Sequence, residues 1–239
     1  PISYEWGYQL DDGTIEWILG GKMLLTGSVE VGENQVSFST TSLINYLTKV
    51  YKKGVYNSSG RSLYDLAVDV LEDSNIDSSQ YNLWSGLKSI KTDAPLPKLE
   101  ARQLLQIIAT TGNCILFTNR ENVINIQPFN YVLNPDGMSY DFITSNPVVK
   151  VQSELHNTII YINHYSKEDN VSELFKNESL EITGTKTIEI EYDLATDISA
   201  TITGGTIVNA NYYGRYAILK ITNTGEDTIS LKVSGKKIN

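Results

Sequence analysis

The sequence predicts an α+β protein that is mostly β, in which antiparallel β-barrel or sandwich elements flank a small unit of two helices and a hairpin. Three observations predict this class. Apolar and polar residues alternate between glycine turns in the first forty residues, apolar residues follow helical spacing from about residue 62 to 109, and alternation returns after about residue 131. We therefore expect three units: a β-rich segment that is part of a barrel (1–57), an α/β unit (58–130) and an antiparallel β domain (131–239).

The N-terminal segment contains three predicted strands and one predicted helix. The strands are expected at residues 14–19, 22–31 and 35–39, with turns at 12–13, 20–21 and 32–34. After them, Leu43, Leu47, Val50 and Tyr51 recur at helical spacing. This spacing predicts a short helix that ends at Gly54.

The middle unit contains the strongest helical patterns. Ser62 and Asp65 have the spacing of a capping box, and the apolar stripe that follows predicts a helix up to a polar loop at 73–80. A Pro-Leu-Pro breaker at 95–97 precedes a second helical stripe from Ala101 to Ala109, for which Gly112 is the expected left-handed cap. Two short strands, at 114–117 and 123–127, are predicted to form a hairpin with a five-residue loop.

The C-terminal domain is predicted to be an antiparallel sandwich or barrel, because short strands alternate with turns rich in Gly, Asn and Asp. Residues 167–177 are polar and acidic, so we expect a surface loop there. Strands are expected at residues 148–151, 158–163, 179–182, 187–192, 198–203, 213–222 and 228–233.

Composition restricts the possible functions. The chain has 239 residues and a formal net charge of −9, with no run of basic residues, which argues against a nucleic-acid partner. No apolar stretch reaches the length of a membrane span, and no signal peptide is recognisable, so no membrane insertion is expected. The chain begins at Pro1 without methionine and ends at Asn239 after a strand-like run, which favours a fragment of a longer protein.

The sequence offers few residues for metal or nucleophilic chemistry. Cys114 lies in an apolar run and is expected to be a buried small hydrophobe. His156 and His164 would lie about 26 Å apart on one straight strand, at ~3.3 Å per residue, so they could not share a metal. Residues 73–79 copy part of the oxygen spacing of a calcium loop, but Ser78 replaces its glycine and Trp84 its final Glu, so a solvated loop is favoured.

No motif predicts catalysis. The sequence has no nucleophile elbow, no phosphate-binding glycine loop and no metalloprotease motif. A glycosidase needs only two carboxylates, and Glu189 and Glu191 are examples in an alternating strand, so an uncharacterised carboxylate hydrolase stays an alternative. We predict a protein that is not an enzyme, with no catalytic residue, no cofactor and no metal site.

The middle unit resembles a known family. Residues 62–67, the Leu-Pro step at 96–97, the helix 101–109, Gly112 and the hairpin tip 119–122 together resemble the middle region of bacteriophage tail proteins. These are the baseplate-hub and tail-tip proteins of phages and prophages of Gram-positive bacteria, distantly similar to contractile-tail hubs and type VI secretion spikes.

The likeness extends over residues 30–130 and more loosely over 145–239. In the family the hairpin turn is roughly Arg-Asp-Gly, whereas this chain has Arg120 followed by Glu121 and Asn122. Asn tolerates a positive φ, so the hairpin survives the change. The segments 221–225 and 229–238 resemble the strand-rich region that follows the middle unit in these proteins.

The resemblance implies a structural function. Such proteins surround the tail axis, usually as homotrimers, and join the tail tube to fibres or a tip, so the expected partners are other tail and baseplate proteins and the expected location is the virion tail. The alternative from another class is a β module that binds carbohydrate or a cell surface. Its candidate residues are the aromatic side chains Trp6, Trp84, Tyr212 and Tyr213, which could stack on sugar rings.

Overall fold

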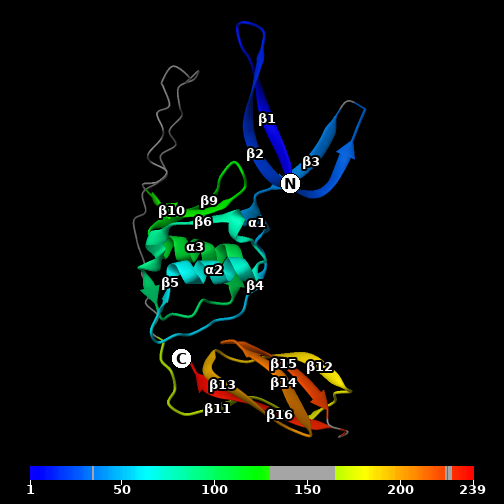
Figure 1. Cartoon of the computed structure of the whole chain (residues 1–239), viewed down its shortest axis with the longest axis vertical. Helices are drawn as coiled ribbons and strands as arrows, with labels where there is room; N and C mark the ends of the chain where they lie inside the picture. The colour runs from blue at the N-terminus through cyan, green and yellow to red at the C-terminus, as the bar shows by residue number, and fades with distance from the viewer. Residues whose placement is uncertain (34, 130–164, 224, 226–227) are drawn as a thin grey trace, which may run out of the picture.

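The computed structural model describes residues 1–33, 35–129, 165–223, 225 and 228–239, and it has three parts (Figure 1). An N-terminal sheet extends from one side of a helical middle unit, and a pair of sheets lies on the other side. Strands make up 52% of the structure and helices 17%, which confirms the mostly β α+β class. The predicted strands at 148–151 and 158–163 lie outside the described residues.

The N-terminal sheet consists of β1 (Ile2–Gln9), β2 (Ile15–Val31) and β3 (Val36–Thr41), in the order β1-β2-β3 with antiparallel pairing. The predicted turn at residues 20–21 is wrong, because β2 runs through both glycines. The register shifts at this point, so that Gly20 is an extra residue opposite β1. A Cβ on Gly20 would lie 2.1 Å from the Tyr4 ring, so glycine is needed here for a bulge and a close ring contact.

The helix predicted to end at Gly54 is also wrong in extent. Helix α1 covers only Leu43–Tyr46, since Leu47 leaves the helical conformation with ψ at 64°. The chain then extends as β4 (Val50–Tyr51), which pairs with β8 (Leu99–Glu100). Leu47 and Tyr51 are nevertheless buried in the middle unit. The spacing of Leu47 and Tyr51 therefore arises because both side chains are buried on one side of the chain, and not because the helix continues.

The two long helices of the middle unit confirm the prediction. Helix α2 covers Leu63–Asp73, and its Ser62 cap accepts a hydrogen bond from the Asp65 amide at 3.1 Å. Helix α3 covers Ala101–Thr111. Gly112 is the C-cap of α3 as predicted, but its φ is −80°, so the predicted left-handed conformation is wrong and occurs at Asn113 instead. No described helix is long and apolar enough to cross a membrane.

The predicted hairpin is confirmed, with β9 (Cys114–Thr118) antiparallel to β10 (Ile124–Pro128) and Asn122 at φ 63°. A third strand, β6 (Tyr81–Leu83), lies parallel to β10 and was not predicted. The apolar faces of this sheet and of both long helices share one core that also includes residues 43–51, upstream of the boundary expected at 58. The remaining short elements are β5 (Arg61–Ser62), η1 (Ser78–Gln80), η2 (Ser85–Lys88) and β7 (Lys91–Thr92).

The C-terminal strands form two antiparallel three-stranded sheets, β11-β16-β13 and β12-β15-β14, around a common core. Their central strands β15 and β16 contribute its fully buried side chains, such as Leu219 and Leu231. Neither these sheets nor the N-terminal one closes into a barrel among the described residues. The strands are β11 (Ser172–Leu180), β12 (Thr185–Glu191), β13 (Ala195–Thr203), β14 (Gly205–Tyr212), β15 (Tyr216–Asn223) and β16 (Ile229–Lys237).

Two predictions for this region are wrong. The surface loop expected at 167–177 is wrong from Ser172 onward, because residues 172–177 belong to β11, an edge strand paired with β16. Strand β14 was missed, since the strand predicted at 213–222 begins only at Tyr216 and a turn separates it from β14.

Candidate functional site

Among the described residues, the N-terminal sheet exposes more large apolar side chains than either of the other two parts. The exposed fractions reach 66% for Trp6, 62% for Trp17 and 78% for Val31. No residue of this sheet belongs to the fully buried cores of the other two parts, and only Leu24 packs at the edge of one. We call residues 1–41 the N-terminal arms. Contiguous exposed apolar surface of this kind marks an interaction site.

The hairpin of β1 and β2 is apolar on both faces. Residues paired across antiparallel strands lie on the same face, and the register pairs Trp6 with Ile18 and Gly7 with Trp17. One face therefore has Tyr4, Trp6, Tyr8 and Ile18, and the other has Ile15, Trp17 and Leu19. A strand that is apolar on both faces is typical of a sheet covered on both sides. The arms thus have the chemistry of buried strands and the exposure of surface strands.

Glycines allow the aromatic rings of the arms to lie against the opposite strand. A Cβ on Gly7 would lie 2.9 Å from the Trp17 ring. The rings of Tyr4 and Trp6 meet edge to face, with centroids 5.9 Å apart. These contacts order the rings and leave their outer surfaces exposed, which suits them to docking on another surface.

The aromatic residues proposed for sugar binding do not gather around one site. Trp84 packs against the core of the middle unit. Tyr213 stacks on Tyr216 at 4.5 Å, and the Tyr212 hydroxyl accepts a hydrogen bond from the Ala200 amide. Only Trp6 of the four lies on the arms. Trp17, its counterpart on the other face, was not singled out from the sequence, because alternation predicts strand faces and does not show whether they are covered.

Among the residues predicted as candidates for metal or nucleophilic chemistry, those that the structure describes have structural roles. Cys114 is buried, which raises the pKa of its thiol and disfavours the reactive thiolate. In the string 73–79, Asp73 pairs with lysines and Asp77 caps η1. His156 and His164 lie outside the described residues. Among the described residues, no three His, Cys, Asp or Glu side chains gather to hold a metal ion.

A network of charged groups at Asp69 fixes the segment before α2 to that helix. The Asp69 carboxylate accepts hydrogen bonds from the Tyr51 hydroxyl at 2.8 Å, from Lys53 at 2.7 Å and from Arg61 at 3.1 Å. Desolvation by itself would raise the pKa of Asp69, but the bonds from Lys53 and Tyr51 outweigh it and the net pKa is lowered. The carboxylate is therefore ionised at neutral pH, and all three donors come from residues 51–61.

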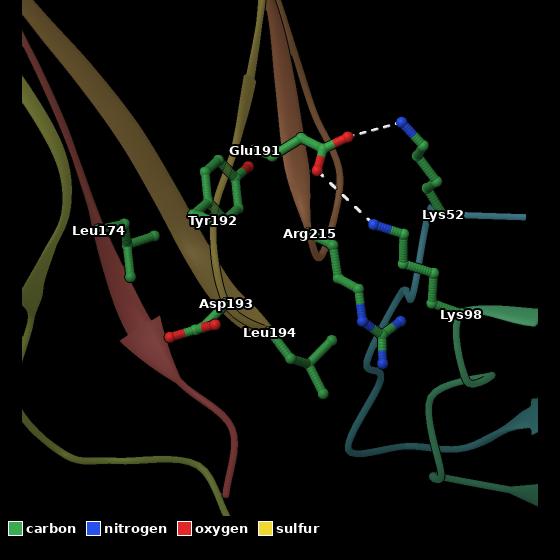
Figure 2. Close-up of a pocket in the computed structure, with 8 residues that line it drawn as sticks. All are labelled: Lys52, Lys98, Leu174, Glu191, Tyr192, Asp193, Leu194 and Arg215. Carbon is green, nitrogen blue, oxygen red and sulfur yellow. Dashed lines mark hydrogen bonds and ion pairs between the residues drawn. The ribbon is translucent and has the colours of Figure 1, made fainter.

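A cavity of about 520 Å³ lies between the middle unit and the C-terminal sheets (Figure 2). At its rim, the Glu191 carboxylate pairs with Lys52 at 2.5 Å and with Lys98 at 3.6 Å. Glu189 lies 3.6 Å from the same Lys52. The hydrogen bond from Lys52 lowers the pKa of Glu191, whereas a glycosidase acid needs a raised pKa. The Glu189–Glu191 pair is thus engaged in holding two parts of the chain together.

Two glycines and one arginine form a tight contact at this junction. The Arg215 guanidinium points from the sheets toward the middle unit and donates to the Leu96 carbonyl at 2.9 Å (Figure 2). Burial lowers its pKa. A Cβ on Gly214 would lie 2.0 Å from the Gly54 carbonyl oxygen, and one on Gly54 would lie 2.0 Å from the Arg215 side chain. Only glycine at both positions permits this approach.

The comparisons with known proteins identify no relative. No protein-family model, no curated protein and no solved structure matches the chain. Function must therefore be inferred from the arms, the two cores and the charged contacts between them.

The Asp69 network predicts a specific dependence of stability on pH. A lowered native pKa stabilises the fold above the unfolded value of about 3.9, and this contribution is lost as the pH falls through the native pKa. Asp69→Asn should reduce the free energy of unfolding at pH 7 by roughly 1–3 kcal/mol, as expected for hydrogen bonds to a charged group, and should flatten its decline in acid. Urea unfolding from pH 7 to pH 3 measures both effects. The exposed Asp93→Asn is the control, and equal behaviour of the two variants would contradict the account.

The junction predicts that one added methyl group separates the two parts. Gly214→Ala should prevent the approach of Gly54 while leaving both cores intact. We expect an increased radius of gyration in X-ray scattering and faster proteolysis at residues 52–58, with an unchanged circular dichroism spectrum. The control is Gly32→Ala, whose Cβ would meet its nearest atom at an ordinary 3.5 Å. An unchanged radius of gyration in Gly214→Ala would show that this contact does not hold the parts.

Proposed function

We propose that the chain is a structural component of a bacteriophage tail tip or baseplate hub, which docks onto other tail proteins through its N-terminal arms. The observation that carries the proposal is the exposure of Trp6 and Trp17 on opposite faces of one hairpin. Covering both faces requires a partner that surrounds the hairpin or two partners that enclose it. Assembly into a multi-subunit structure provides such cover.

The arrangement of the three parts also supports a bridging function. The arms lie at one end of the molecule and the C-terminal sheets at the other, with the middle unit between them (Figure 1). The middle unit and the C-terminal sheets each have their own core. A chain of this form could connect two layers of an assembly. The resemblance of residues 62–128 to phage tail proteins is the reason to propose a phage tail protein in particular. The proposed location is the virion tail, and the expected homo-oligomer is a trimer.

Electron microscopy tests the location. A host strain that encodes the chain would be induced to produce particles, and these would be labelled with an antibody to the purified protein. We expect gold label at the tail tip. Label elsewhere on the particle, or particles without label, would contradict the proposal.

Variants of the arms test the docking surface in the same particles. Trp6→Ser with Trp17→Ser should leave the purified chain folded and reduce its incorporation at least tenfold, because the buried anchors of an interface carry most of its affinity. Tyr46→Ser is the matched control, since Tyr46 is 65% exposed but lies in α1 outside the arms. Equal incorporation of all three proteins would contradict docking through the arms. Selective glycan binding that depends on Trp6 would support a carbohydrate-binding module instead.

A further inference from the structure

The outer edge of β3 is available for pairing. Strand β3 (Val36–Thr41) bonds to β2 by one edge, and within the described part of the chain no strand pairs with its other edge. Its six residues include no charged residue and no proline. Native proteins commonly block exposed edges with such residues, because a free edge accepts another strand. In the described part of the chain, neither a paired strand nor a charged residue or proline of β3 therefore prevents another strand from pairing with this edge.

The two faces beside this edge differ in chemistry. Val36 and Phe38 lie on one face, and the register places Val31 across from Val36 on the same face. All three are exposed. Ser37 and Ser39 lie on the other face, where Glu30 is the partner of Ser37. A strand added at this edge would thus lie beside Val36 and Phe38 on one face, while on the other face Glu30 would lie two strand spacings away, roughly 10 Å, within reach of a long side chain.

The charge of the arms determines which polar residues suit that strand. Residues 1–41 contain six carboxylate side chains but only one lysine, Lys22, and no arginine. None of these carboxylates forms an ion pair with a described residue, although many carboxylates of the other two parts do. A partner with cationic side chains would provide the missing counter-charges.

A second copy of the chain is a poorer occupant. Pairing two β3 edges would bring together two arms that both carry an excess of carboxylates. The faces beside β3 offer no lysine or arginine to offset them. Like charges brought together oppose association. The occupant therefore belongs to a different protein.

We infer that the free edge of β3 binds an extended segment of another protein in which apolar residues alternate with lysine or arginine. The inference rests on the proposed docking function of the arms and specifies the partner. Main-chain hydrogen bonds to β3 would supply affinity, since a strand added to a sheet edge continues its ladder. The apolar residues would cover Val36 and Phe38, and the basic residues would face Glu30.

Three nine-residue peptides test this chemistry on the purified 239-residue chain. In the first, valine alternates with lysine; in the second, valine alternates with glutamate; the third has the composition of the first with its lysines in one block. Fluorescence anisotropy of labelled peptide measures binding. We expect the valine-lysine peptide to bind at least tenfold more tightly than either of the others. Its binding should weaken as the salt concentration rises from 50 to 500 mM, because salt screens exposed charges. Equal binding of all three, or no binding, would overturn the inference.

Variants of the chain show where the peptide binds. Glu30→Gln with Glu33→Gln should weaken binding of the alternating valine-lysine peptide at least fivefold, and Phe38→Lys should abolish it. Glu72→Gln with Glu181→Gln removes two exposed carboxylates outside the arms, and Tyr46→Lys adds a cation outside them. If these control variants lost as much peptide affinity as the arm variants, the peptide would be attracted by the net negative charge alone, and the inference would be overturned. Dimers of the wild-type chain in sedimentation velocity that disappear in Phe38→Lys would assign the edge to a second copy.

These results are separable from the test of tail location. Peptide selectivity without label at the tail tip would remove the phage assignment and leave the edge chemistry intact. Label at the tail tip without peptide selectivity would leave the tail function and remove the inference about the partner.

Discussion

Burial of apolar surface is the interaction on which the rest of this structure depends, and it is distributed unevenly along the chain. Helix α2 buries its apolar face against α3, α3 also packs on β9, and the two C-terminal sheets bury their apolar faces against each other. Each square ångström of apolar surface removed from water contributes roughly 25 cal/mol, so these cores stabilise their own parts. The arms have comparable side chains but leave them in water. This imbalance is the physical reason to assign them to an interface.

Charged groups have a second, connecting role. Asp69 fixes residues 51–61 to α2, and Glu191 links the C-terminal sheets to two lysines of the middle unit. Exposed ion pairs contribute little stability individually, so the junction depends more on the glycine contact and on the Arg215 hydrogen bond. With the middle unit and the C-terminal sheets held together in this way, the C-terminal sheets would present their outer surface at a fixed position relative to the middle unit.

The sequence predicted the elements whose local and tertiary signals agree. Helices α2 and α3 have helical spacing, caps and buried faces, and Asn122 has the side chain that its hairpin turn requires. The sequence failed where one signal had two causes. Gly20 was interpreted as a turn but forms a bulge beneath Tyr4, and the spacing of Leu47 and Tyr51 arises from burial in extended chain. The surface proposed for docking could not be predicted, because alternation in residues 15–19 does not reveal whether another surface covers these strand faces.

Hydrogen exchange of the intact, isolated chain tests the central claim most directly. Because no core of their own stabilises the arms, backbone amides of β1 and β3 should exchange at least a hundredfold faster than those of α3, β15 and β16, since exchange from native protein follows local stability. The same amides should become protected when the chain is incorporated into its assembly. Protection of β1 and β3 equal to that of α3 in the isolated chain would mean that the arms are already covered, and would contradict their assignment as a docking surface.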